Sequence, residues 1–197
     1  MRATTYDKAK KVAAQHHGYV RTRTLKDNGV TDRQIASLVE EGVLEKISHG
    51  CFWHPEAGGE KPPFYQAIEV NMTNPKAVLC SYSAAYLHGL IDSVPEKLYY
   101  ATAREDRHKM TLPYESRRYY YPQLHFEEGI QTIETPYGEY RIYDLDRTVC
   151  DCVRFRREVP TETLKALLER YREDPRQNSE ALERYRRLIL RNRPIFR

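Results

Sequence analysis

The chain has 197 residues, of which 40% are hydrophobic and 30% charged, and its formal net charge is +4. This composition is typical of globular proteins and argues against a mainly disordered chain. No apolar run reaches the roughly 20 residues of a membrane helix. The N-terminus MRATTYDKAKK also lacks the apolar core of a secretory signal, so we expect a cytoplasmic protein that does not enter a membrane.

Three short helices are predicted in the first 42 residues. The first runs over about residues 6–16 and the second over a few residues around Leu25. Their ends carry typical capping and stop residues: Thr4 or Thr5 and then Gly18 for the first helix, and Thr22 or Thr24 and then Asn28-Gly29 for the second. Between these two helices, Gly18-Tyr19-Val20 is expected to be a short extended piece.

The third helix is expected to run from Thr31 to Gly42. Thr31 and Gln34 form the T-x-x-Q pattern of a capping box, in which each side chain bonds the backbone N–H of the other residue. Ile35, Leu38 and Val39 are spaced i, i+3 and i+4, so they share one face of the helix. That face is expected to be buried, which leaves the opposite side exposed.

A hairpin follows the third helix. Residues 43–47 and 51–53 are predicted strands, and Gly50 in the turn permits the positive φ that a tight hairpin needs. Gly58 to Pro63 then opposes both helix and central strand. We therefore expect two domains, residues 1–57 and residues 64–197.

The second domain mixes helical and strand patterns, which predicts an α+β fold. Helices are expected at residues 64–70, 83–89, 147–156, 161–171 and 179–190. Strands are expected at residues 98–103 and 118–121, and a hairpin at residues 130–134 and 139–143. The tyrosines at positions 99, 100, 119, 120 and 121 are interpreted as alternating between the core and solvent, although base stacking is another use of such rings.

Three helices followed by a hairpin are the plan of a winged helix-turn-helix, whose third helix enters the major groove of DNA. The expected DNA-contacting residues on this helix are Thr31, Asp32, Arg33, Gln34 and Ser37. Arg33 is the best candidate for reading a base, because a guanidinium can bond guanine O6 and N7 together. Lys46, Ser48 and His49 are expected on the wing, and Arg21 and Arg23 at the phosphate backbone.

The distribution of charge supports this interpretation. Residues 1–35 carry 8 Lys or Arg against 3 Asp or Glu, and residues 141–197 carry 15 against 10. Such clusters suit a negatively charged partner, but they are also found on ordinary solvated surfaces. A winged helix can also serve as a protein-docking surface, so the fold alone does not establish DNA binding.

Three segments resemble the AbiE-type antitoxin family, the regulatory half of type IV toxin–antitoxin systems. They are the first 60 residues, NPKAVLCSYSAAYLHGL (74–90) and YDLDRTVCDCVRFRR (143–157). The resemblance implies a repressor that binds inverted-repeat duplex DNA in its own promoter, with dimerisation expected on such an operator. It also implies a functional partner, a nucleotidyltransferase-like toxin that the second domain opposes without a stable complex.

The alternative is a metal-dependent enzyme of nucleotidyltransferase type, because Asp144 and Asp146 form a D-x-D pair of the kind that holds magnesium. However, the chain contains no Gly-Ser dipeptide, which such an enzyme needs to grip phosphate, and neither E-x-K nor D-x-K of a restriction-type nuclease. Asp146 is better interpreted as a helix cap. We therefore expect no catalytic residue, no metal and no cofactor.

Several other residue groups are expected to be structural. Ser83 is interpreted as a helix cap and His88 as a packing residue, because no G-x-S-x-G elbow surrounds the serines. The four cysteines lack zinc-ribbon spacing and are expected to be reduced. The arginines of the final helix are either a solvated face, a nucleic-acid surface or a contact with a second copy: Arg184, Arg186, Arg187, Arg191 and Arg193.

Overall fold

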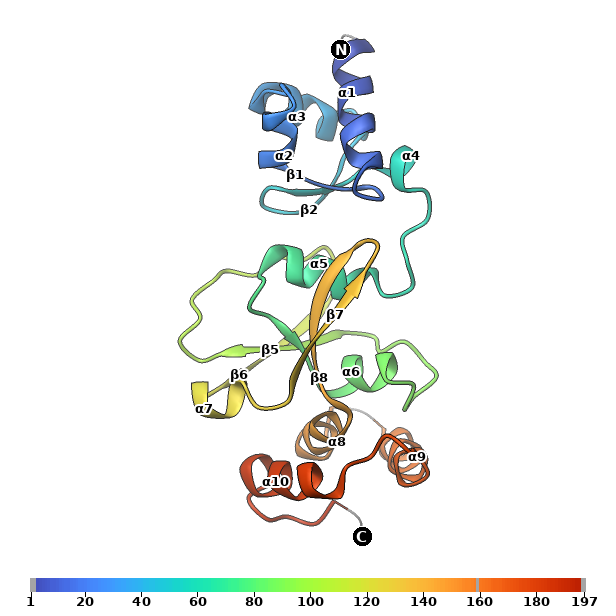
Figure 1. Ribbon diagram of the computed structural model, residues 1–197, viewed down its shortest axis with the longest axis vertical. Helices are drawn as coiled ribbons and strands as arrows, with labels where there is room; N and C mark the ends of the chain where they lie inside the picture. The colour runs from blue at the N-terminus through green and yellow to red at the C-terminus, as the bar shows by residue number, and fades with distance from the viewer. Residues whose placement is uncertain (1–2, 159, 196–197) are drawn as a thin grey trace. The chain divides into compact units, whose positions relative to one another are not determined.

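The computed structural model describes residues 3–158 and 160–195 and confirms the α+β fold class (Figure 1). The chain forms two compact units. The first comprises Met1–Pro75 with Lys109–Pro113 and Glu134–Glu139, and the second comprises Lys76–His108, Tyr114–Ile133 and Tyr140–Arg197. Each unit is described by itself.

The first unit begins with the predicted three helices. They are α1 (Ala3–Ala14), α2 (Thr22–Asp27) and α3 (Asp32–Glu40). A three-stranded antiparallel sheet of order β1-β3-β2 accompanies them, formed by β1 (Tyr19–Arg21), β2 (Glu45–Ser48) and β3 (Cys51–Trp53). The short extended piece expected after Gly18 is therefore a third strand that pairs with the hairpin.

The core of this unit is formed by the face of α3 that the sequence indicated. Leu38 is completely buried and Ile35 is 5% exposed, while Val39 is half-buried against the same cluster. Val12 and Ala13 of α1 and Leu25 of α2 are also members of that cluster. The opposite side of α3 stays exposed, as amphipathic spacing requires.

Two expected helix starts are wrong. Helix α1 already begins at Ala3, so Thr4 and Thr5 lie inside it instead of capping it. Helix α2 begins at Thr22, and its N-cap Arg21 makes no side-chain capping bond. Strand β1 passes directly into α2 because the N–H of Thr22 bonds the carbonyl of Gly50 in the hairpin turn. That backbone bond satisfies one of the free N–H groups at the start of the helix.

The indole of Trp53 is enclosed by two glycines. Gly18 has φ +96°, and a Cβ at this position would lie 2.6 Å from both the Trp53 ring and the Cα of Gly58. Gly58, which the sequence placed in a linker, is the last residue of the short helix α4 (Pro55–Gly58). Glycine at both positions therefore lets two backbone segments approach the ring closely.

The compact units divide at Pro75 and not at the Gly58–Pro63 stretch. Helix α5 (Tyr65–Thr73) belongs to the first unit, where its Thr73 donates a hydrogen bond to Ser48 of β2 at 2.9 Å. The domain limits at residues 57 and 64 stay a prediction.

The second unit contains a five-stranded mixed sheet of order β6-β5-β4-β8-β7. The strands of this sheet are β4 (Val78–Leu79), β5 (Leu98–Ala103), β6 (Ser116–Tyr121), β7 (Ile130–Thr135) and β8 (Gly138–Tyr143). The turn end of the β7–β8 hairpin, Glu134–Glu139, is counted with the first unit. Strand β4 runs antiparallel to β5 and parallel to β8, and β5 runs parallel to β6. Its helices are α6 (Ser81–Leu87), α7 (Gln123–Phe126), α8 (Leu145–Arg154), α9 (Thr161–Arg172) and α10 (Ser179–Leu190).

Helix α8 lies at the centre of this unit and packs against α6, α9 and α10 (Figure 1). Nine of its ten residues are buried. All four cysteines of the chain carry free thiols and are buried, as expected.

The predicted alternation of the tyrosines holds on one strand and fails on the other. On β6, Tyr119 and Tyr121 are buried while Tyr120 is 52% exposed. On β5, Tyr99 and Tyr100 are both buried, because all six residues of this strand are covered. A strand buried on both faces has no solvent side to which every second ring could point.

Two further expected caps are wrong. Asp144 caps α8, because its Oδ1 accepts a hydrogen bond from the N–H of Arg147 at 2.8 Å, whereas Asp146 is buried in the first turn. Ser83 lies inside α6, and its hydroxyl accepts a bond from the N–H of Tyr99. His88 is a satisfied packing residue, as expected, since its Nε2 lies 2.8 Å from the carbonyl oxygen of Tyr143.

Candidate nucleic-acid interface

The N-terminal end of α3 is fixed by the predicted capping box. The Thr31 hydroxyl accepts a bond from the N–H of Gln34 at 3.3 Å, and Gln34 Oε1 accepts one from the N–H of Thr31 at 2.8 Å. Gln34 Nε2 also donates to the hydroxyl of Thr5 on α1 at 3.0 Å. No local pattern predicts this last bond, because it joins residues 29 positions apart. The capping residues therefore anchor the helix, and both ends of the Gln34 amide are used within the protein.

The exposed side of α3 presents one unpaired cation. Arg33 is exposed and forms no ion pair among the residues that the structure describes. Asp32 is paired with Lys26 at 2.8 Å, and the hydroxyl of Ser37 donates to Glu41 at 3.0 Å. A guanidinium in the first turn of an anchored helix is available for a base edge or a phosphate without breaking a bond within the protein.

The wing presents two of its three predicted residues. Lys46 and His49 are exposed. Ser48 is 5% exposed, and its hydroxyl accepts the bond from Thr73. Ser48 therefore lies on the wing, as expected, but its side chain is turned toward α5, and its contact with DNA stays a prediction.

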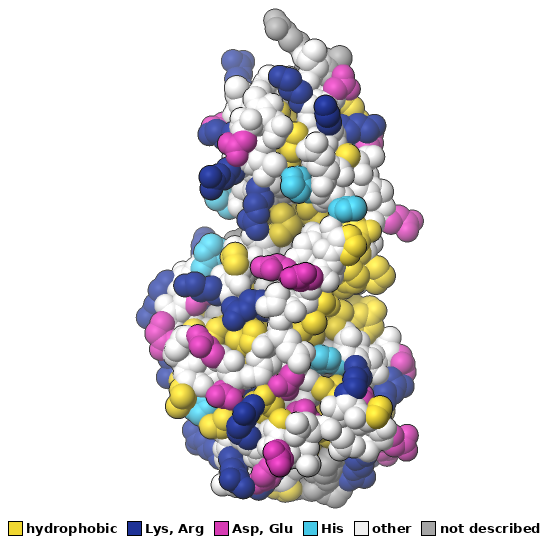
Figure 2. All heavy atoms as spheres, in the orientation of Figure 1, with side chains coloured by type: hydrophobic (Ala, Val, Ile, Leu, Met, Phe, Trp, Pro, Cys, Tyr) yellow, Lys and Arg dark blue, Asp and Glu magenta, His cyan; other side chains and the backbone are white. Residues whose placement is uncertain are grey.

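The two arginines expected at the phosphate backbone differ in availability. Arg21 donates to the carbonyl of Met72 at 3.0 Å, so part of its guanidinium is used within the first unit. The Arg23 side chain is 93% exposed, and its contact with Asp27 is long at 3.9 Å. In water such an exposed pair contributes little, so Arg23 can exchange Asp27 for a phosphate. Figure 2 shows Lys and Arg side chains distributed over the surface of this unit.

The D-x-D pair is engaged by the protein itself. Asp144 accepts from the N–H of Arg147 and from the hydroxyl of Tyr185, the latter at 2.6 Å. Asp146 accepts from the hydroxyl of Tyr171 at 2.6 Å and from the N–H of Asn178 at 2.9 Å. Across residues 3–158 and 160–195 no group of three or more His, Cys, Asp and Glu side chains is arranged to hold a metal ion. Both carboxylates therefore already serve as hydrogen-bond acceptors within the second unit.

Three helices, a two-stranded hairpin and an exposed N-terminal end of the third helix define a winged helix-turn-helix, a class of DNA-binding fold. Residues 7–52 match the model of the family AbiEi_4, described as "Transcriptional regulator, AbiEi antitoxin". The resemblance to AbiE-type antitoxins is therefore confirmed over this segment, which comprises most of the winged helix. For the rest of the chain it stays a prediction.

A solved structure with the same fold is the crystal structure of the RV2827C protein from Mycobacterium tuberculosis. The TM-score is 0.72 at 15% sequence identity, and the match covers 98% of this chain and 73% of that chain. At this identity the similarity concerns the fold alone. The comparison with curated proteins gives no match. In the part of the chain that the structure describes, no helix is long and apolar enough to cross a membrane.

Proposed function

We propose that the protein is a transcriptional repressor and antitoxin that binds an inverted-repeat operator in its own promoter through α3 and the wing. The observation that carries this proposal is Arg33. It is exposed and without an ion-pair partner among the described residues, and it lies in the first turn of a helix that the hydrophobic core and the capping box hold in place. The family match over residues 7–52 supports the regulatory role.

The other parts of the proposal follow from the same family. The second unit counteracts a nucleotidyltransferase-like toxin without forming a stable complex, and two copies bind the two halves of the operator. A repressor acts on chromosomal DNA, so the protein works in the cytoplasm. The four free buried thiols accord with a reducing compartment.

The test is binding of the purified full chain to a labelled duplex of its own promoter, measured by fluorescence anisotropy against a scrambled duplex of equal length. Arg33→Ala is expected to weaken operator binding by about 1–3 kcal/mol, roughly 5- to 150-fold, and to reduce the preference over the scrambled duplex. Lys46→Ala is expected to weaken binding to both duplexes equally and to lower its salt dependence.

Arg157→Ala is the matched control, because Arg157 is an exposed arginine of the second unit. It is expected to leave operator affinity unchanged. Equal affinity of the wild-type chain for operator and scrambled duplex, or an Arg33→Ala variant that binds like the control, would contradict the proposal. The antitoxin role is tested separately, by whether co-expression with the adjacent toxin gene restores growth.

A further inference from the structure

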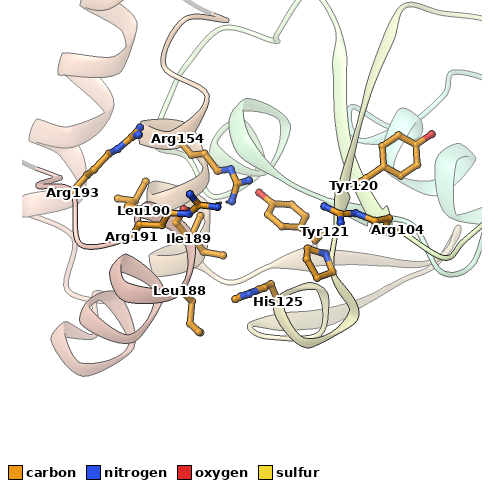
Figure 3. Close-up of a pocket in the computed structure, with 11 residues that line it drawn as sticks. Arg104, Tyr120, Tyr121, His125, Arg154, Leu188, Ile189, Leu190, Arg191 and Arg193 are labelled. Atoms are coloured by element: carbon orange, nitrogen blue, oxygen red, sulfur yellow. Dashed lines mark hydrogen bonds between the residues drawn. The ribbon is translucent and has the colours of Figure 1, made fainter.

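A small pocket in the second unit is lined by basic side chains. Its volume is about 290 Å³, and four arginines and one histidine contribute to it: Arg104, His125, Arg154, Arg191 and Arg193. Figure 3 shows the guanidinium groups of Arg104, Arg154 and Arg191 around the ring of Tyr121. No Asp or Glu lines the pocket. These residues come from the end of β5, from α7, from the last turn of α8 and from the segment after α10, so no local sequence pattern joins them.

The charge of this pocket is not neutralised by ion pairs. None of the four arginines forms a salt bridge within the described part of the chain. The next arginines on α10 behave differently, since Arg186 and Arg187 share Glu183 at 2.6 and 3.0 Å. Like charges around one cavity repel each other, and a bound anion would remove that repulsion.

The backbone after α10 is bent in a way that brings two of these arginines to the pocket. Arg191 and Asn192 have φ of 51° and 65°, a left-handed conformation that side chains other than glycine rarely adopt. The bend is held by two bonds with Arg186, whose carbonyl accepts from the N–H of Asn192 at 3.3 Å and whose guanidinium donates to the Asn192 carbonyl at 2.7 Å. Strain that the surrounding structure maintains in this manner is often found at binding sites.

Carbonyl groups at the C-terminal end of α10 also lie here, and their partial negative charge opposes anion binding. Two of them are already bonded. The Ile189 carbonyl accepts from Arg154 at 3.4 Å, and the Leu190 carbonyl accepts from the N–H of Arg193 at 3.1 Å. The first bond also orients the Arg154 guanidinium, which lies 5.1 Å from the centre of the Tyr121 ring.

Two tyrosines of β6 complete the pocket. Tyr121 is 1% exposed, and its hydroxyl donates to Asp151 at 2.6 Å, which fixes the ring in the wall of the pocket. Tyr120 is 52% exposed although it is a large aromatic side chain. Its ring points away from Arg154 and Arg191 (Figure 3) and therefore lies at the rim of the pocket, with the Arg118 guanidinium 4.8 Å from its centre. Aromatic rings of this kind stack on a base beside arginines that bind the phosphates.

We propose that this pocket binds a phosphorylated nucleoside, with Arg104, Arg154 and Arg191 contacting phosphate oxygens and Tyr120 stacking on the base. Several guanidinium charges line the pocket, which matches the charge of a di- or triphosphate better than that of a single phosphate. The volume is at the lower end of the range for ligand pockets, so it accommodates the phosphate groups while the base stays at the rim. The same chemistry is offered by a free nucleotide and by the 5′ end of an RNA strand.

The test is calorimetric titration of the full chain with tripolyphosphate, adenosine, ATP and GTP at two salt concentrations. Tripolyphosphate and both nucleotides are expected to bind, more weakly at higher salt, whereas adenosine alone is not. A short RNA with a 5′-triphosphate, compared with the same RNA carrying a 5′-hydroxyl, distinguishes the two sources. Tighter binding of the 5′-triphosphate RNA than of ATP identifies a strand end as the ligand, and the reverse order identifies a free nucleotide.

Variants assign the binding to the pocket. Arg154→Gln and Arg191→Gln are each expected to weaken nucleotide binding at least about 10-fold. Tyr120→Ala is expected to weaken ATP binding at least about fivefold while leaving tripolyphosphate binding unchanged. Arg187→Gln is the matched control on α10 and is expected to bind like the wild type, because its partner is Glu183.

The far-ultraviolet circular dichroism of each variant checks its folding, and operator binding of Arg191→Gln separates this proposal from the proposed repressor function. That variant is expected to bind the operator normally. Absence of tripolyphosphate and nucleotide binding at millimolar concentration would overturn the proposal, and so would binding that Arg154→Gln and Arg191→Gln leave unchanged.

Discussion

The two units build their interiors from different side chains. The cluster that holds α3 consists of aliphatic residues and Phe52. In the second unit, Asp146, Arg147 and Asp151 of α8 are buried beside a hydrophobic core that contains seven tyrosines. The cluster around α3 is stabilised by removing apolar surface from water, and the buried Glu69 of the first unit, paired with Lys61 at 2.7 Å, lies outside that cluster. In the second unit the buried charges lie on α8, the helix that forms part of the hydrophobic core itself, so their stability there depends on polar partners. Single substitutions and changes of pH should therefore affect the two units differently.

The buried cation Arg147 is at the centre of this difference. Its guanidinium lies 3.4 Å from Asp151, donates to the carbonyls of His125 and Glu128, and lies 4.3 Å from the centre of the Tyr143 ring. Burial lowers the pKa of Arg147, but Asp151 and the neighbouring tyrosines raise it more, so the group stays charged. Burial raises the pKa of Asp151, and Arg147 offsets part of that rise.

The largest expected effect is therefore that of Arg147→Met. Removing one partner of a buried ion pair costs about 3–5 kcal/mol, because the other is left without compensation. Trp53 is the single tryptophan and lies in the first unit, so its fluorescence monitors that unit in a urea titration, while circular dichroism at 222 nm monitors both. We expect the second unit to unfold at lower urea and the fluorescence transition to stay where it is.

Two further variants test the reason for that effect. Arg147→Met combined with Asp151→Leu is expected to recover most of the lost stability, since neither charge of this pair then remains buried. Arg117→Met removes an exposed pair with Glu158 at 3.7 Å and is expected to change stability by less than about 1 kcal/mol. A single Arg147→Met variant as stable as Arg117→Met would show that the buried pair does not distinguish the units.

Leu38→Ala is the corresponding change in the aliphatic interior. Leu38 is completely buried on α3, so its truncation leaves a cavity and is expected to cost about 2–5 kcal/mol. In this variant the Trp53 fluorescence transition should move to lower urea. Leu124→Ala is the control, because Leu124 is 74% exposed. If both variants unfolded at the same urea concentration, α3 would not be held by this side chain, and the proposed recognition helix would lose its support.

The contrast between the interiors also explains what the sequence could predict. Ile35, Leu38 and Val39 mark the core face of α3 because apolar spacing alone determines it. The limits of β5, β3 and α10 were also predicted correctly. A run of apolar or aromatic residues marks the two strands, and regular helical spacing of apolar residues marks α10. Arg147 could not be recognised as a core residue, since its burial depends on acceptors from distant segments, the carbonyls of His125 and Glu128.

The candidate sites show the same limit. The exposure of Arg33 and Lys46 follows from the local helix and hairpin patterns. The burial of Ser48 and the bond between Gln34 and Thr5 depend on contacts with α5 and α1. The arginine pocket could not be predicted from the sequence, because Arg104, Arg154 and Arg191 are separated by dozens of residues. The local pattern places Arg191 only in a basic C-terminal segment, in which Arg184, Arg186 and Arg187 form ion pairs.

The smallest expected effect concerns the one imidazole that is buried in the first unit, His54. It is 0% exposed, and neither ring nitrogen has a hydrogen-bond partner among the described residues. Its ring packs edge-on against Tyr6 at 5.9 Å. Burial lowers the pKa of His54; the charge of Glu56 raises it and that of Lys10 lowers it further, but both effects are smaller than that of burial. The folded unit therefore keeps this imidazole neutral.

Because the pKa is lower in the folded than in the unfolded state, the unfolded chain takes up a proton first as the pH falls below about 6.5. The stability of the first unit should then decrease by at most about 1.4 kcal/mol per pH unit from this group. His54→Leu is expected to flatten this decrease in Trp53 fluorescence titrations at pH 7.5, 6.5 and 5.5. His49→Gln, which replaces an exposed histidine, should show the same decrease in stability as the wild type. An unchanged pH dependence in His54→Leu would mean that His54 is not the group whose protonation destabilises the first unit, and the buried Glu69 would then be the next group to replace.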